Sequence, residues 1–178
     1  MAEVHLIGQV VGGYGFDLDC KLSCRWKLIF GGSWKAIEGL TEGSSQLDNP
    51  QSGDIAYWSH PIDVHFLTSG IGGWPKIEVE VWKQDKYGRG SLCSYGCLHV
   101  PSEPGNHVVH CVTWKPLGNF VDQLFSLFTG GSLRLQDNSF ICDPTERARL
   151  QTSPSGQVIF NLNIILRNFE KFGIETIV

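Results

Sequence analysis

The chain has 178 residues, of which 42% are hydrophobic and 18% charged, so it can fold around a substantial core and general disorder is excluded. Its formal net charge of -4 repels phosphate backbones and argues against nucleic acid as a partner. Because the first residues carry no signal-like segment and no run of 18 apolar residues occurs, we expect a cytoplasmic protein whose six cysteines are thiols.

Apolar residues recur at every second position in several short runs, which is the period of a half-buried β-strand. The clearest alternating sets are Cys24, Trp26, Leu28 and Phe30, then Ile77, Val79 and Val81, and finally Val158, Phe160, Leu162, Ile164 and Leu166. In chain order, strands are predicted at 4–11, 24–30, 55–58, 62–67, 77–81, 95–100, 107–113 and 158–166. Glycine and proline turns separate these runs, and Ser59-His60-Pro61 is interpreted as one such turn. The pattern predicts an all-β, antiparallel, eight-stranded sandwich.

One segment late in the chain has helical periodicity instead. Phe120, Leu124, Leu127 and Phe128 recur at helical spacing before Gly130, which predicts one short amphipathic helix near 119–129. The polar stretch 137–156 is predicted to be a long connection. Nothing in the composition divides the chain, so we expect a single domain over residues 1–178.

Several separated motifs resemble the B9 domain family. They are MAEVH at 1–5, YWSHPIDVHF at 57–66, GGWP at 72–75, YGCLHVP at 95–101 and LRNF at 166–169. Together they extend over nearly the whole chain, and several motifs in one order are far more specific than any single motif.

The resemblance implies a C2-like antiparallel sandwich that acts as a non-catalytic scaffold in a protein complex at the ciliary transition zone and basal body. The implied partners are B9 domain-containing protein 1 and the Meckel syndrome type 1 protein. Members of the family support ciliogenesis and help to gate the entry of membrane proteins into the cilium. We expect no cofactor and no catalytic residue, for the reasons that follow.

Many C2 domains bind calcium through several aspartates in their loops. This chain has only some of these aspartates. Asp85 keeps one position, but Lys83 stands where another aspartate is expected, and its ammonium group would repel Ca²⁺. In the earlier loop, Cys24-Arg25-Trp26 replaces the usual aspartate run, although Asp17 and Asp19 lie just upstream. We therefore expect no calcium site.

Two pairs of cysteines, Cys20 with Cys24 and Cys93 with Cys97, raise the alternative of a zinc site. Residues four apart on an extended strand lie about 13 Å apart, so each pair would need a turn to share one metal ion. We interpret these cysteines as small apolar groups packed in the interior.

Ser59, His60 and Asp63 are residue types found in hydrolytic triads. The chain lacks a Gly-x-Ser-x-Gly nucleophile elbow, and triad residues are brought together by the fold rather than by sequence proximity. We predict that the protein is not an enzyme.

Three apolar side chains fall on strand faces that are otherwise polar. Trp82 shares the side of Glu78 and Glu80, while Ile159 and Ile165 lie opposite the core set of the last strand. Exposed apolar clusters often mark interfaces, so Trp82, Ile159 and Ile165 are predicted to bind a partner. The alternative is that the helix or the long connection covers them.

Basic and aromatic residues also gather at one predicted loop, namely Lys83, Lys86, Tyr87 and Arg89. Each basic side chain near anionic lipid contributes about 1 kcal/mol to binding. The loop could therefore make a weak, calcium-independent contact with a membrane surface. The alternative is a solvated loop.

Overall fold

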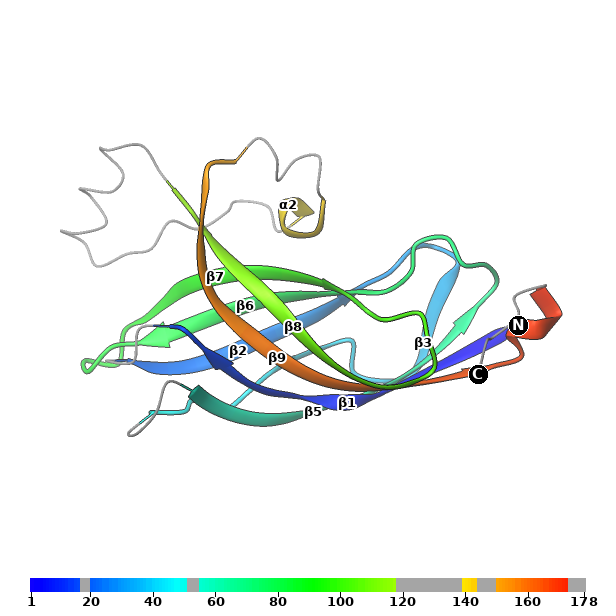
Figure 1. Cartoon of the computed structure of the whole chain (residues 1–178), viewed down its shortest axis with the longest axis horizontal. Helices are drawn as coiled ribbons and strands as arrows, with labels where there is room; N and C mark the ends of the chain where they lie inside the picture. The colour runs from blue at the N-terminus through cyan, green and yellow to red at the C-terminus, as the bar shows by residue number, and fades with distance from the viewer. Residues whose placement is uncertain (17–19, 51–54, 118–138, 144–149, 173–178) are drawn as a thin grey trace.

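The computed structural model describes residues 1–16, 20–50, 55–117, 139–143 and 150–172. Within these residues, nine strands form one antiparallel sheet in the order β3-β5-β1-β9-β8-β7-β6-β2-β4 (Figure 1). The elements are β1 (Ala2–Tyr14), β2 (Lys21–Ile29), β3 (Trp34–Gly39), β4 (Glu42–Ser44), β5 (Ile55–Thr68), β6 (Lys76–Gln84), β7 (Gly90–His99), β8 (Gly105–Pro116), α2 (Ser139–Cys142), β9 (Thr152–Arg167) and η1 (Phe169–Phe172).

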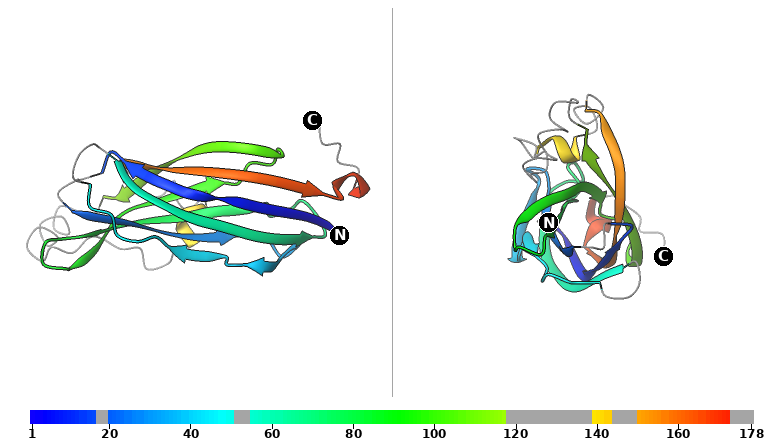
Figure 2. Two further views of the ribbon diagram at one scale, coloured as in Figure 1. Left: turned by 90° about the horizontal axis from the view of Figure 1, so that it is seen from below. Right: turned by 90° about the vertical axis from the view of Figure 1, so that its left-hand side faces the viewer.

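The sheet is rolled around one interior, as the end-on view in Figure 2 shows. One half consists of β3, β5, β1, β9 and β8, and the other of β7, β6, β2 and β4. Within the described residues, the two halves are joined where Tyr95 and Gly96 of β7 pair with Trp114 and Thr113 of β8. This narrow junction lets the two halves face each other as the layers of a sandwich.

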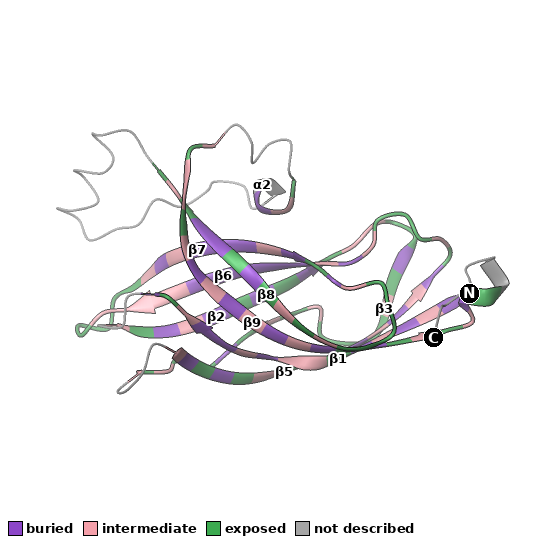
Figure 3. Cartoon of the chain, viewed as in Figure 1, coloured by how far each residue is buried: buried purple, intermediate pink, exposed green. Residues whose placement is uncertain are grey.

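The main core lies between the halves and is built from alternate residues of each strand, so exposed and buried bands alternate along the ribbons (Figure 3). The apolar sets predicted at 24–30, 77–81 and 158–166 are largely buried, including Leu28, Ile77, Val79, Phe160 and Leu162, while Phe30 and Leu166 are half-buried. The strand periodicity therefore predicted the core-facing side of these strands correctly.

The prediction of a turn at Ser59-His60-Pro61 is wrong, because β5 runs through this segment without a break. The chain absorbs the irregularity in a bulge: Ser59 has a φ of 44°, and the pairing of β1 with β5 shifts between Val10 and Gly12. Pro61 lacks an N–H but lies where no described strand pairs with the other edge of β5. A proline is tolerated at such an edge.

Two short edge strands, β3 and β4, were not predicted. Each has little apolar alternation, because β3 buries Trp34 alone and β4 buries no residue. Joining two predicted strands into β5 and adding β3 and β4 gives the nine observed strands in place of eight.

In the part of 137–156 that the structure describes, the chain is more regular than the predicted long connection. This part contains α2, and the predicted end of the connection is wrong because β9 already begins at Thr152. A proline is tolerated at this point of β9. Pro154 pairs with Trp114 next to a bulge of β8. On the other edge of β9, the pairing with β1 ends at Gln157, before the strand reaches Pro154. The helix predicted near 119–129 lies outside the described residues.

A second hydrophobic cluster lies on the outside of the roll, where α2 covers β6 and β7 (Figure 1). It consists of the buried residues Leu92, Tyr95, Trp114 and Ile141, against which Trp82, Cys97, Cys142 and Leu150 pack. The Lys76 ammonium donates a hydrogen bond of 3.2 Å to the carbonyl oxygen of Cys142 and ties the end of α2 to β6. This cluster covers part of the outer surface.

Candidate protein-binding surface

The last strand places Ile159 and Ile165 on its outer side, away from the core. Ile165 is 47% exposed and lies opposite His5 of β1. Ile159 is half-buried and lies opposite His110 of β8. The alternation of β9 thus places both isoleucines on one outer surface.

Neighbouring strands extend this apolar surface. Ile7 of β1 is 43% exposed, and Val108 and Val112 of β8 are 63% and 55% exposed. All three lie on the outer side, because they pair with the outer residues Asn163, Asn161 and Gln157 of β9. We call the set Ile7, Val108, Val112, Ile159 and Ile165 the outer apolar face; its members alternate with amide side chains.

Sequence reasoning missed three of these residues, although they lie inside predicted strands. In 107–113 both sides carry apolar residues: Val109 and Cys111 face inward, and Val108 and Val112 face outward. The pattern alone therefore could not tell which side is exposed. The arrangement of β8 beside β9 decides it.

The structure does not bring Trp82 together with Ile159 and Ile165. Trp82 lies on β6, three strands from β9 in the sheet order, and is half-buried in the second hydrophobic cluster. Its indole Nε1 donates a hydrogen bond of 2.9 Å to Glu80, and the Arg25 guanidinium lies 4.6 Å from its ring centroid. These contacts hold the indole against the sheet.

The predicted basic loop is the hairpin turn between β6 and β7. The Asp85 carboxylate accepts hydrogen bonds from the backbone N–H groups of Tyr87 and Arg89, and it pairs with the Arg89 guanidinium at 2.8 Å. These interactions, led by the bond from the Arg89 backbone, lower the pKa of Asp85. Tyr87 is 85% exposed and Lys86 is exposed beside it, while Lys83 is half-buried at the end of β6.

Of the aspartates considered for calcium binding, Asp85 pairs its carboxylate with the Arg89 guanidinium. Asp17 and Asp19 lie outside the described residues.

Among the described residues, no helix has the length and apolar character needed to cross a membrane.

The cysteine pairs are divided among different surroundings. Cys24 is fully buried in the main core and Cys93 packs against that core, whereas Cys97 packs in the second cluster with Cys142. Cys20 is half-buried just before β2, and all six cysteines are free thiols. Cys93 and Cys97 thus belong to separate clusters.

Ser59, His60 and Asp63 are not assembled into a triad. Asp63 pairs with Ile7 on the outer side of β5, whereas the His60 ring lies on the core side, 6.2 Å from the ring of Trp26. The two side chains therefore point to opposite faces of the strand.

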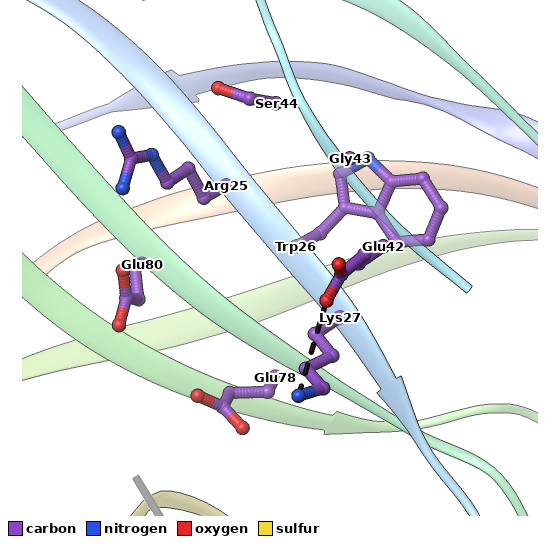
Figure 4. A pocket seen from close by; sticks show the side chains of 8 residues that line it. All are labelled: Arg25, Trp26, Lys27, Glu42, Gly43, Ser44, Glu78 and Glu80. Atoms are coloured by element: carbon purple, nitrogen blue, oxygen red, sulfur yellow. Dashed lines mark ion pairs between the residues drawn. The ribbon is translucent and has the colours of Figure 1, made fainter. Parts of the chain in front are cut away.

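A groove of about 500 Å³ lies beside the short edge strand β4 (Figure 4). It is lined by Arg25, Trp26, Lys27, Glu42, Gly43, Ser44, Glu78 and Glu80. The β2–β6 register places Arg25 opposite Glu80 and Lys27 opposite Glu78, and Lys27 lies 4.0 Å from Glu42. Acids and bases face one another here, so the groove favours neither cations nor anions.

Comparison with known proteins covers almost the entire chain. Residues 4–165 match the family described as "Ciliary basal body-associated, B9 protein", under the heading B9-C2. The chain is 49% identical to B9 domain-containing protein 2 of Danio rerio over 99% of its length and 100% of the relative, and 47% identical to that of Homo sapiens over 98% and 99%.

More distant similarities were found as well. B9 domain-containing protein 1 of Xenopus laevis is 26% identical over 97% of this chain and 88% of its own length. The C2A domain of plant Extended Synaptotagmin 1 superposes with a TM-score of 0.44 and 12% identity, covering 92% of this chain and 93% of that domain. The extent and identity of the B9 matches confirm the resemblance of the sequence motifs, and the chain belongs to the ciliary basal body-associated B9 protein family.

Proposed function

We propose that this protein is a non-catalytic scaffold subunit of the complex that B9-domain proteins form at the ciliary transition zone. The observation that carries the proposal is the outer apolar face. Four of its side chains, on three neighbouring strands, are 43% to 63% exposed. Exposed apolar residues on neighbouring strands, interspersed with amides, are typical of a protein-binding surface.

The proposed partners are B9 domain-containing protein 1 and the Meckel syndrome type 1 protein. Membership of a ciliary basal body-associated family supports this choice, as does similarity to a B9 domain-containing protein 1 along almost the whole chain. In this role the protein supports ciliogenesis and the gating of ciliary membrane proteins. Its contribution is to hold partners together rather than to catalyse a reaction.

Within the proposed interface, Ile159 and Ile165 act with Ile7, Val108 and Val112. Burial of a partly exposed Val or Ile side chain contributes on the order of 1 kcal/mol. Trp82 is proposed to make a separate and smaller contact with a partner, because its indole is already half-buried. The outer apolar face is therefore the part of the surface whose loss weakens the complex most.

A double variant tests the proposal. The chain is co-expressed with both partners, either as wild type or as Val108→Ser/Ile165→Ser, and the co-purified complex is quantified. Loss of two apolar contacts should weaken capture about tenfold or more, since about 1.4 kcal/mol corresponds to a factor of ten. A Trp82→Gln variant should weaken capture less.

The matched control is Ile71→Ser, which removes a 59% exposed isoleucine in the β5–β6 connection. Capture by this variant should equal that of the wild type. If a folded Val108→Ser/Ile165→Ser variant captures both partners as well as Ile71→Ser does, the outer apolar face is not the interface.

A second candidate function is calcium-independent binding to phospholipid through the β6–β7 turn. The observation in its favour is the exposure of Lys86, Tyr87 and Arg89 at one hairpin tip, with Lys83 at its base. Pairing of Arg89 with Asp85 removes part of the positive charge, so this contact would be weak. Liposomes containing phosphoinositides should sediment the chain at low salt and release it when Lys86 and Tyr87 are changed to Ser; absence of sedimentation would reject this function.

A further inference from the structure

Three potential metal ligands meet on the outer side of β1 and β5. Glu3 and His5 lie on β1, and His65 lies directly opposite His5 on β5. The two imidazole rings are stacked with centroids 3.7 Å apart. One ligand atom from each of Glu3, His5 and His65 lies within 4.8 Å of the other two, and all three residues are half-buried.

The environment of His65 indicates that this cluster is more than a histidine stack. Its Nε2 atom is buried and makes no hydrogen bond with any residue that the structure describes. The nearest acidic oxygen, Oε2 of Glu3, lies 3.7 Å away, which is beyond hydrogen-bond distance. A buried ring nitrogen without a hydrogen bond is an unfavourable arrangement that a metal ion would relieve.

The observed separation suits two ligands of one metal ion. Zinc ligands lie about 2.1 Å from the ion, and in tetrahedral geometry two such ligands are about 3.4 Å apart. The distance of 3.7 Å between Glu3 Oε2 and His65 Nε2 is close to this value. A small side-chain rotation would therefore place both atoms in one coordination sphere. The His5 ring must also turn out of its stack with His65, because an imidazole nitrogen binds a metal ion in the plane of its ring.

We propose that Glu3, His5 and His65 bind a divalent transition-metal ion of the zinc class on the outer surface of the sheet. Two imidazoles and one carboxylate are ligands that zinc and its neighbours accept, whereas calcium and magnesium require mainly oxygen ligands. Three protein ligands leave a fourth position for water or another donor. The residues are held by two paired strands, so the sheet fixes the spacing of their backbone positions.

Arg167 is the competing cation at this site. Its Nη1 lies 3.6 Å from Oε2 of Glu3, and its side chain is 71% exposed. An exposed ion pair of this length contributes little to stability. Arg167 can therefore move into solvent when Glu3 turns towards the metal ion.

The test uses the full chain, treated with a chelator and then titrated with Zn²⁺. Calorimetry and native mass spectrometry should show one zinc ion per chain. His5→Gln and His65→Gln should each weaken binding at least tenfold, and Glu3→Gln should also weaken it. The matched control is His110→Gln, which changes an exposed histidine on the outer side of β8 and should bind like the wild type.

Substitution of Co²⁺ for Zn²⁺ identifies the ligands, because six free cysteines could also bind these ions. The proposal predicts a cobalt spectrum without a sulfur-to-metal charge-transfer band, with the signal lost in either histidine variant. Circular dichroism establishes that each variant is folded, and if one variant unfolds the other decides the question. Absence of zinc binding, sulfur ligation, or unchanged binding in both histidine variants would overturn the proposal, and none of these results depends on partner binding.

Discussion

Two cysteine thiols, Cys24 and Cys142, have pKa values raised by their surroundings. Cys24 is fully buried, and desolvation, reinforced by Cys111 and Glu80, raises its pKa. A hydrogen bond with Cys97, together with burial, raises the pKa of Cys142. Both groups are therefore neutral thiols near pH 7 and act as apolar packing atoms.

The buried thiol of Cys24 predicts how stability depends on pH. In the unfolded chain a thiol ionises near pH 8.5, whereas folded Cys24 keeps its proton to higher pH. Above pH 8.5 the folded state therefore binds more protons, and the free energy of unfolding falls as pH rises. Between pH 8.5 and 9.5, wild type should lose about 1 kcal/mol more than Cys24→Ala in urea unfolding; parallel profiles for the two proteins would contradict this assignment.

The alternation of residues predicted which side of a strand a side chain lies on better than it predicted whether that side chain is exposed. The alternation of β9 placed Ile159 and Ile165 on the outer side, where the structure has them. Trp82 was also predicted to face outward, but the second hydrophobic cluster half-buries it. Cover by a distant segment such as α2 is a tertiary property, so strand periodicity cannot reveal it.

Whole elements were predicted where their apolar alternation is long. β9, β6 and β2 follow from period two alone, whereas β3 and β4 pair at sheet edges with few buried residues. The turn predicted in β5 reflects real irregularity at Ser59, but a bulge accommodates it. The pairing of His5 with His65 depends on the β1–β5 register, which no local pattern predicts.

The pairing of the edge strand β3 with β5 can be tested at the last residue of β3, Gly39. Gly39 has a φ of 88° and pairs with Val64 of β5. A Cβ atom at this position would meet the carbonyl oxygen of Asp63 and would lie 2.9 Å from the Cα of Val64. Gly39→Ala should therefore lower the free energy of unfolding by at least about 1 kcal/mol, measured by urea denaturation.

Gly72→Ala is the matched control for this change. Gly72 does not have a positive φ, and a Cβ atom there would have no neighbour within 4 Å in the described part of the chain. Its free energy of unfolding should change by less than about 0.5 kcal/mol. Equal stability of the two variants would show that β3 does not constrain Gly39 against β5.

Across the whole molecule, the rolled sheet separates two kinds of outer surface. The second hydrophobic cluster and α2 cover β6 and β7, while β1, β9 and the outer side of β8 carry exposed apolar residues. Sequence motifs were enough to predict the family and the all-β fold. They could not predict the outer apolar face, because it is assembled from three strands whose order is set by the whole sheet.

Contact between the outer apolar face and another B9-domain protein can be tested by site-specific photo-cross-linking. A photoreactive amino acid is placed at Val108 in one preparation and at Ile71 in another, and each is mixed with B9 domain-containing protein 1 and the Meckel syndrome type 1 protein. We predict a cross-link to one of these partners from position 108 and none from position 71. Equal cross-linking from both positions, or cross-linking from position 71 alone, would contradict the claim.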